Sequence, residues 1–370
     1  MSYTLRGEVA DARIQLGIDL IYQLRFDEAD RHFEAIIAQN PDNPLGHFFR
    51  AMVAWWRVLI DLEDESHDQS FYDLLDHCIE VCDRRLDEDP DDFDAILFKG
   101  GAIGFRGRLR GDRHQYLRAV RDGIRCLPLL KRSRQLDPAN KDILFGQGIY
   151  NYFAAMAPMK FPIIRPLMLF FAKGDRELGI AQLEQVAAEG RYARTEAKYF
   201  LGQIYRLFED DPVRALSYLT ELGDTYPKNS IFHRFRGRVL VSADRWQEAR
   251  QLYEDIRSRA AKGWPGYHRR AHIEALYYIG RHAFRERDAS TAATVFSRAD
   301  SLSYGLGDDL DLQAFRGYVS LANLYLGMSL DELGRRAEAM RRYDRVLRLP
   351  AKGSSHKRAE GYKREPFTRE

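Results

Sequence analysis

Apolar residues recur along most of this chain at the three- and four-residue intervals of an amphipathic helix. In residues 3–40 this periodicity runs from Ile14 to Leu20, passes a short turn, and resumes from Phe26 to Pro41. Proline does not continue a helix, so Pro41 marks the end of the second one. The pattern predicts two antiparallel helices packed against each other.

Small residues at a fixed spacing predict where such helices touch. Gly17 and Ala29 lie twelve residues apart and allow a close approach, and Phe33 fills the space between the helices. The same arrangement returns as Gly237 with Ala249 and Tyr253, Gly280 with Ala292 and Phe296, and Gly327 with Ala339 and Tyr343, while Gly202, Ala215 and Leu219 fit with one extra turn residue. This recurrence resembles the tetratricopeptide repeat.

The resemblance implies an all-α fold, a right-handed superhelix of about eight antiparallel helical hairpins. Three hairpins keep the spacing less strictly, over residues 44–89, 93–137 and 142–188. We expect one repeat domain over residues 1–350. Residues 351–370 have no apolar period and carry six Lys or Arg against three Glu, so we expect a basic disordered tail.

The fourth hairpin contains an apolar insert over residues 157–172, interrupted by Pro158, Pro162 and Pro166. Residues 142–186 resemble the sequence block of the tetratricopeptide proteins linked to mitochondrial outer-membrane and inclusion-body clearance functions. We expect the insert to fold over neighbouring hairpins, as a groove lid or as a lipid-facing surface. Its candidate apolar residues are Phe161, Ile163, Leu167 and Phe170.

Charge is distributed unevenly between two early hairpins. Residues 61–94 contain fifteen acids against two arginines, and residues 106–134 contain ten Lys or Arg against two acids. We favour the interpretation that neighbouring repeats pair with each other across these blocks; the alternative is that each block meets a partner of opposite charge. The net charge of the whole chain is only +2, so no nucleic-acid partner is expected.

The sequence carries no secretory signal, because residues 1–18 have no continuous apolar segment, and no charge-poor run reaches the length of a membrane span. We therefore expect a soluble, cytoplasmic protein, and leave open a signal removed upstream of Met1. Cys78 and Cys82 fall on the apolar side of one helix, which predicts buried thiols rather than a disulfide framework.

No motif for catalysis, metal binding or nucleotide binding is supported. Gly100, Gly104, Gly107 and Gly111 share one helix face, as in helix packing, and lack the strand and the Gly-Lys-Ser/Thr of a phosphate loop. His268 and His272 are four residues apart, but no acid stands between them as in a zinc helix. We expect no enzyme activity, no cofactor and no metal.

The resemblance implies that first helices line a concave face, with positions three before, one after and four after the small glycine pointing into it. These positions form a candidate peptide-binding site of Tyr199, Gln203, Arg206, Arg234, Arg238, Tyr277 and Arg281. Guanidinium groups favour carboxylates and tyrosines supply rigid contact area. The alternative is that these arginines pair with Glu196 and Glu274 of the chain itself.

We expect a protein-interaction scaffold or adaptor that binds an extended or helical, acidic peptide in its groove. The alternative is an adaptor that contacts a membrane surface or a lipid through the 157–172 insert. The identity of the partner and the oligomeric state do not follow from the sequence.

Overall fold

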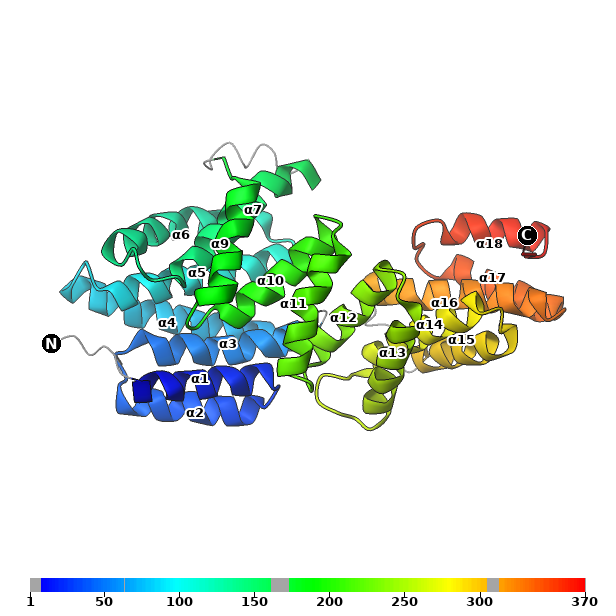
Figure 1. The fold of residues 1–370 in the computed structure, drawn as a ribbon, viewed down its shortest axis with the longest axis horizontal. Helices are drawn as coiled ribbons and strands as arrows, with labels where there is room; N and C mark the ends of the chain where they lie inside the picture. The colour runs from blue at the N-terminus through cyan, green and yellow to red at the C-terminus, as the bar shows by residue number, and fades with distance from the viewer. Residues whose placement is uncertain (1–7, 63, 161–172, 305–312, 370) are drawn as a thin grey trace. The chain divides into compact units, whose positions relative to one another are not determined.

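The computed structural model describes residues 8–62, 64–160, 173–304 and 313–369, and within them all regular secondary structure is helical (Figure 1). The prediction of an all-α fold is therefore confirmed. The chain divides into two compact units, residues 1–229 and 230–370. From the repeat spacing we expected one repeat domain over residues 1–350. The spacing does not report how tightly successive helix pairs pack on each other, so it does not predict a division within the repeats.

In the first unit, consecutive helices pack in antiparallel pairs, and most pairs also pack against the next. The helices are α1 (Glu8–Tyr22), α2 (Phe26–Gln39), α3 (Pro44–Ile60), the 3₁₀ turn η1 (Glu65–His67), α4 (Asp68–Glu88), α5 (Phe93–Asp112), α6 (Tyr116–Leu136), α7 (Ile143–Lys160), α9 (Arg176–Glu189), α10 (Arg194–Leu207) and α11 (Pro212–Thr225).

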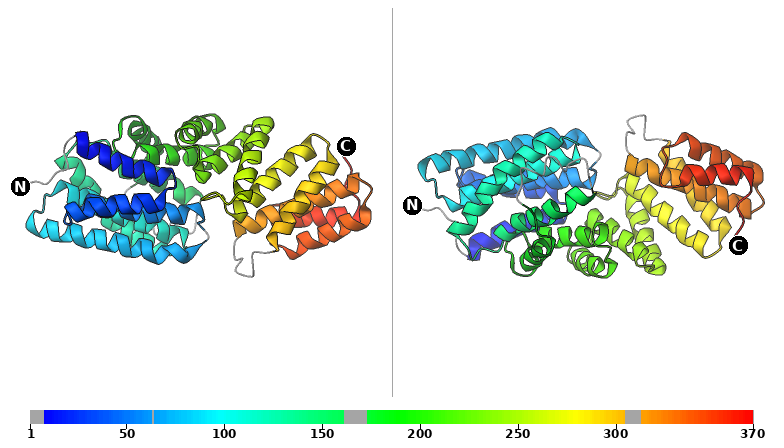
Figure 2. Two further views of the ribbon diagram at one scale, coloured as in Figure 1. Left: turned by 90° about the horizontal axis from the view of Figure 1, so that it is seen from below. Right: turned by 90° about the horizontal axis from the view of Figure 1, so that it is seen from above.

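The second unit follows the same plan. Its helices are α12 (Ser230–Ser242), α13 (Trp246–Ala261), α14 (Arg269–Arg285), α15 (Ala289–Ser303), α16 (Gln313–Glu332), α17 (Arg336–Arg348) and α18 (Ser355–Arg364). The first helices of two successive hairpins, α14 and α16, pack directly on each other, and α18 packs on both α16 and α17 (Figure 2).

Short polar residues begin several of these helices. The Asn43 side chain accepts a hydrogen bond from the backbone N–H of Leu45 at 2.9 Å, and Pro44 occupies the first turn, where its missing N–H costs nothing. Asp92, Asp175, Asp211 and Asp288 cap α5, α9, α11 and α15 in the same way. The helix starts are thus encoded locally.

Each glycine of the repeat spacing lies against the large side chain that the sequence pairs with it. A Cβ built on Gly280 would lie 2.6 Å from the Phe296 ring, and one built on Gly327 would lie 2.5 Å from the Tyr343 ring. Phe296 and Tyr343 are fully buried. The same contact joins Gly17 to Phe33, Gly202 to Leu219 and Gly237 to Tyr253. The predicted pairing of helices is therefore the observed one in these five pairs.

The acidic and basic blocks of the first unit pair with each other. The Asp68 carboxylate meets Arg113 at 2.6 Å, Asp76 meets Arg106 at 2.5 Å, and Asp91 pairs with Arg132. The preferred interpretation, charge pairing between neighbouring hairpins, is confirmed for these contacts. Cys78 and Cys82 are free thiols and fully buried, as predicted.

The structure differs from expectation at the C-terminus. Residues 355–364 form α18 instead of a disordered tail, because Ala359 is fully buried against the preceding hairpin and Tyr362 packs on Tyr343 with ring centroids 5.8 Å apart. One small and one aromatic residue at three-residue spacing are enough to anchor this short helix. The prediction of a disordered tail missed these two residues because it was based on the composition of residues 351–370 as a whole.

The fourth hairpin differs in detail. α7 continues through Ala157 to Lys160, the first residues of the predicted insert, while Phe161, Ile163, Leu167 and Phe170 lie outside the described residues. Within the hairpin, Gly148 approaches Leu183 of α9, whereas Gly146 approaches Leu130 of the preceding hairpin. Within this hairpin the close contact between the two helices is therefore made at Gly148.

We predict that Gly280→Ala destabilises the protein by about 1–2 kcal/mol. The added methyl collides with the Phe296 ring, at a cost of roughly 1–3 kcal/mol, and alanine's higher helix propensity offsets about 0.5–1 kcal/mol of it. Gly361→Ala in α18 is the matched control, since a Cβ there meets nothing within 4 Å, and it should be neutral or stabilising. Urea denaturation of the full chain measures both; equal stability of the two variants would contradict the packing described.

Candidate functional site

First helices of the second unit bring a set of arginine and tyrosine side chains together. Helical spacing places Glu274, Tyr277, Tyr278 and Arg281 along α14, and Arg234 and Arg238 one turn apart on α12. From α16 and α18 come Tyr318, Tyr325 and Arg358. We call these nine residues the arginine–tyrosine cluster. Their rings are in contact, for example Tyr277 with Tyr318 at 5.3 Å between centroids.

At one end of the cluster, Glu274 holds two arginines. Arg234 Nε donates to Glu274 Oε2 at 2.9 Å, and Arg238 donates through Nε at 2.6 Å and through Nη2 at 2.7 Å. The Glu274 carboxylate is only 1% exposed. Burial alone would raise its pKa, but the attraction and hydrogen bonds of Arg238 and Arg234 outweigh burial and lower the pKa to about 2. Glu274 is therefore a carboxylate at neutral pH.

At the other end, Arg281 has aromatic neighbours instead of an acid. Its guanidinium lies 4.3 Å from the centroid of the Tyr325 ring and 5.5 Å from that of Trp246, and it donates to the Tyr277 hydroxyl at 2.9 Å. Cation–π attraction of this kind holds a charge in place without neutralising it. The Nε atom of Arg281 is buried and has no hydrogen-bond partner, and no carboxylate of the described residues forms an ion pair with this arginine.

Arg358 of α18 approaches the same tyrosine. Its guanidinium lies 5.4 Å from the Tyr325 centroid and 5.8 Å from that of Tyr362, and one Nη donates to the Met328 sulfur at 3.2 Å. It too lacks an ion pair with any carboxylate in the described part of the chain. Two guanidinium groups, Arg281 and Arg358, thus share one ring and leave a local excess of positive charge.

In the first unit a different arginine is surrounded by aromatic rings. Arg108 of α5 lies 4.6 Å from the Trp55 centroid and 4.4 Å from that of Phe200, with Tyr199 at 5.9 Å. Glu196 lies 3.7 Å away. Burial raises the pKa of Glu196, although Arg108 and the Tyr22 hydroxyl, which donates to it at 3.2 Å, act in the opposite direction.

The seven predicted site residues therefore fall into separate groups. Arg234 and Arg238 meet at Glu274, and Tyr277 meets Arg281. In the first unit, Arg206 donates to Gln203 at 2.9 Å, and Tyr199 lies beside Arg108. Tyr199 and Tyr277 are each 4% exposed, so they support the neighbouring side chains and offer little accessible surface to a ligand. Pairing with Glu274, one of the two alternatives weighed from the sequence, accounts for Arg234 and Arg238.

Two arginines of these sites were not singled out from the sequence. Arg108 follows Gly107 directly, the same position relative to a glycine as Arg281 to Gly280. It was missed because Gly107 and Ala119 keep the twelve-residue spacing, but Gly123 stands where the other repeats have a large side chain sixteen residues after the glycine. Arg358 was missed because its segment was expected to be disordered. The available signal was Ala359 and Tyr362, spaced as on one helix face.

The described residues contain neither a metal-binding cluster nor a membrane-spanning helix. No cluster of three or more His, Cys, Asp or Glu there could hold a metal ion. His268 instead caps α14, where its Nδ1 accepts from the Ala271 N–H at 3.3 Å. Within the same residues, no helix combines the length and the apolar character needed to cross a membrane.

Comparison with protein families finds the tetratricopeptide repeat in three places. One family model matches residues 14–57 and 207–267, and a second matches residues 321–349. These ranges contain Gly17, Gly237 and Gly327 with their aromatic partners. A comparison with curated protein sequences found no match.

Comparison with solved structures finds chains that are similar to this one. The human IFIT1 dimer with m7Gppp-AAAA has a TM-score of 0.50 at 13% identity, covering 89% of this chain and 68% of that chain. The C-terminal part of a TPR repeat-containing protein from Cytophaga hutchinsonii has a TM-score of 0.38 at 18% identity, covering 80% and 98%. Yeast Tom70 has a TM-score of 0.41 at 9% identity, covering 96% and 88%. Identities this low indicate the fold alone.

We predict that Arg238→Met destabilises the protein by about 3 kcal/mol, because removing one member of a buried ion pair leaves a carboxylate poorly compensated. Arg257→Met is the matched control. Arg257 is 50% exposed, and its one ion pair among the described residues is with Glu254 on its own helix, so its loss should change stability by less than about 0.5 kcal/mol. Thermal unfolding compares the two; similar melting curves would show that the Glu274 contacts contribute little.

A second prediction concerns pH. The pKa of Glu274 falls from 4.5 to about 2 on folding, so its contribution to stability is complete above about pH 5 and is lost as the pH falls towards 2. The shift corresponds to roughly 3 kcal/mol. Glu274→Gln should be less stable at pH 7 and should lose less stability than wild type between pH 5 and pH 2. Urea midpoints at a series of pH values measure this, and parallel pH profiles would exclude a lowered pKa.

Proposed function

We propose, from the premise that this chain contains tetratricopeptide repeats, that it is a non-enzymatic protein-interaction scaffold. Its ligand is an extended or helical peptide segment that carries acidic side chains or a free C-terminal carboxylate. Helix-pair repeats present side chains of several helices on one continuous surface, which suits a peptide better than a small substrate. The arginine–tyrosine cluster of the second unit is the proposed binding surface.

One observation carries this proposal: Arg281 is fixed among aromatic rings and has no carboxylate partner in the described chain. The Tyr277 hydroxyl and the faces of Tyr325 and Trp246 fix the plane of its guanidinium. A carboxylate accepts from such a group in two parallel hydrogen bonds with little further loss of side-chain freedom. The buried Nε of Arg281 has no hydrogen-bond partner, so a shift of the side chain that brings it to a carboxylate oxygen of the ligand would satisfy an unpaired donor.

The other cluster members have supporting roles in this proposal. Arg234 and Arg238 carry two positive charges against the single charge of Glu274, so their end of the cluster remains cationic. Arg358 adds a second positive charge beside Tyr325. This field favours an acidic ligand and accelerates its approach. Since Arg234 and Arg238 also hold a buried carboxylate, reversing their charge would disturb folding as well as binding.

In the first unit, we assign a peptide-contact role to Gln203 and Arg206, with Tyr199 as the wall behind them. Gln203 and Arg206 lie one turn apart on α10 and are hydrogen-bonded to each other. They offer amide and guanidinium groups on a rigid helix. The aromatic ring of Tyr199 is nearly buried and fixes the position of Arg108 next to it.

The proposal predicts that Arg281→Glu weakens the binding of acidic peptides at least tenfold, about 1.4 kcal/mol or more. The probe is an array of synthetic 15-residue peptides, each made with Asp and Glu and again with Asn and Gln at the same positions, with free and amidated C-termini. Arg341→Glu is the control, since it makes the same charge change at an exposed position of α17. Fluorescence anisotropy ranks the affinities.

Two results would contradict the proposal. One is that peptides with Asn and Gln bind as well as their acidic versions, which would remove the need for an arginine. The other is that Arg281→Glu and Arg341→Glu reduce binding equally, which would reflect net charge and not a site. The melting temperature of each variant shows whether it is folded.

A further inference from the structure

Helix α6 packs on α5 along one face and leaves an apolar stripe on the opposite face largely exposed. The covered face packs on α5: Arg106 binds the buried Asp122 carboxylate at 2.9 Å, and the Cys126 thiol donates to the Gly100 carbonyl at 3.3 Å. A Cβ on Gly100 would lie 3.4 Å from Leu129. Asp122, Cys126 and Leu129 recur at four- and three-residue spacing, so they form one stripe along the helix.

The opposite stripe of α6 is exposed. Leu117 is 72% exposed and Ile124 45% exposed, while Val120 and Leu127 are partly buried. These four residues follow one another at intervals of three, four and three, and the same series continues through Lys131 and Arg134. This is the spacing by which one helix packs along another in a coiled coil. The stripe is apolar in its first half and basic in its second.

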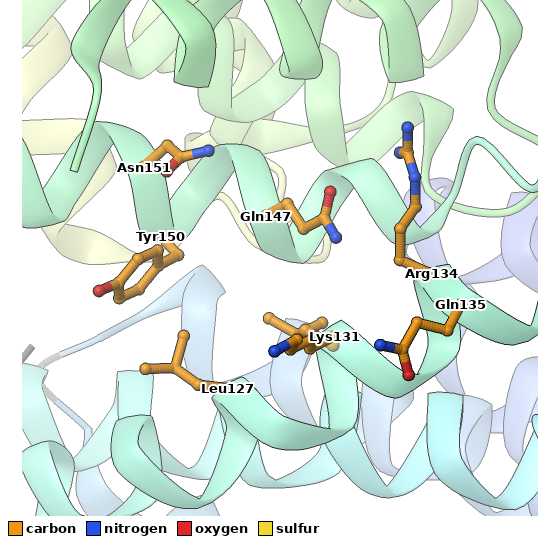
Figure 3. Close-up of a pocket in the computed structure, with 8 residues that line it drawn as sticks. Leu127, Lys131, Arg134, Gln135, Gln147, Tyr150 and Asn151 are labelled. Atoms are coloured by element: carbon orange, nitrogen blue, oxygen red, sulfur yellow. The ribbon is translucent and has the colours of Figure 1, made fainter. Parts of the chain in front are cut away.

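Beside the second half of this stripe lies a cavity of about 360 Å³ between α6 and α7. Figure 3 shows Leu127 and Lys131 on the α6 side, facing Gln147 and Tyr150 on α7. The two helices touch closely where Leu130 meets Gly146, a site at which a Cβ would come within 2.7 Å of the leucine. Away from this crossing they separate, and Pro128 interrupts the hydrogen-bond ladder of α6.

Positive charge on α6 remains after the pairing of the two charge blocks. Asp122 forms ion pairs with Arg106 and Arg110, and Arg132 forms an ion pair with Asp91. No carboxylate in the described part of the chain forms an ion pair with Arg121, Arg125, Lys131 or Arg134. Arg121 and Arg125 are exposed and follow Val120 and Ile124 directly, so they flank the apolar stripe.

We propose that the exposed stripe of α6 is the docking surface for an acidic amphipathic helix of a partner protein. Apolar side chains of that helix would pack on Leu117, Val120, Ile124 and Leu127, as in a helix-in-groove complex. Its acidic side chains would meet Arg121 and Arg125 at the flank and Lys131 and Arg134 at the end. From Leu117 to Arg134 the stripe is about 26 Å long at 1.5 Å per residue, so it accommodates about five helical turns.

Two features favour a helix over a lipid surface as the occupant. The cavity between α6 and α7 is a depression, which side chains of a helix can fill and a bilayer surface cannot. The amide side chains of Gln147 and Asn151 also line it; each shares one hydrogen bond with Gln182, and their remaining amide groups are suited to hydrogen bonds with a polypeptide. This surface is in the first unit and involves none of the residues of the proposed peptide site, so it extends the proposed function to a second partner.

The experiment uses two synthetic peptides of 21 residues as probes. Both have leucine at the a and d positions of three heptads; one has glutamate and the other lysine at e and g. Binding of the fluorescently labelled peptides to the full chain is measured by anisotropy. We expect saturable binding of the glutamate peptide and none of the lysine peptide.

Two variants of the full chain test the site. Arg121→Glu/Arg125→Glu should weaken binding at least tenfold, and Ile124→Asp should do the same through the apolar stripe. The matched control is Arg341→Glu/Arg348→Glu, which reverses two exposed arginines of α17 and should leave affinity within twofold of wild type. Because the glutamate peptide also fits the proposed peptide site, each measurement is repeated in an Arg281→Glu background, where binding that remains and is lost with the α6 variants is assigned to α6, so that a failure here is distinguishable from a failure of the proposed peptide site.

Three outcomes would overturn the inference. In the first, the glutamate peptide does not bind the wild-type chain. In the second, the α17 control loses as much affinity as the α6 variants. In the third, vesicles of phosphatidylserine bind the wild-type chain and not Arg121→Glu/Arg125→Glu, while the peptide does not bind; α6 would then be a membrane-contact surface. Circular dichroism melting curves confirm that each variant is folded.

Discussion

The close approach of a helix backbone to a large side chain sixteen or seventeen residues later is the contact on which this structure depends. At Gly280 and Gly327 the absent Cβ leaves room for the rings of Phe296 and Tyr343, both fully buried. Interiors at crystal-like density tolerate little change at such points, so the contact fixes the distance and rotation of each helix pair. The same geometry returns in the five helix pairs that keep this contact, and each of these pairs thereby presents the same face of its first helix.

That repetition explains how residues far apart in sequence form one cluster. Arg238, Glu274 and Tyr318 come from three successive first helices. Within the cluster, arginines have different roles according to what lies beside them. Arg238 and Arg234 hold a buried carboxylate and so join two helices, whereas Arg281 is held by aromatic rings and is the arginine that we propose for binding the ligand. In the proposed function, similar residue types therefore divide between stabilising the fold and binding a partner.

Much of the architecture follows from local signals in the sequence, and much of the site does not. Helix pairs and their register could be predicted because glycine, alanine and an aromatic residue recur at fixed spacing. Ion pairing of Arg234 and Arg238 with Glu274 is a contact between repeats, so the sequence leaves two alternatives open. α18 escaped prediction because two anchoring residues, Ala359 and Tyr362, are diluted by charged neighbours. Exposure of the α6 stripe depends on how far α7 lies from α6, which no local pattern encodes.

The central claim is that Arg281 receives a carboxylate of the ligand, and side-chain NMR tests it most directly. In protein labelled with ¹⁵N at arginine Nε, the Arg281 resonance is assigned by its loss in Arg281→Lys. Addition of an acidic peptide that binds the wild-type chain should shift this resonance and slow the exchange of its proton with water, while the Arg341 resonance stays unchanged. Saturating peptide with no change at Arg281 would contradict the account, because the ligand would then bind elsewhere.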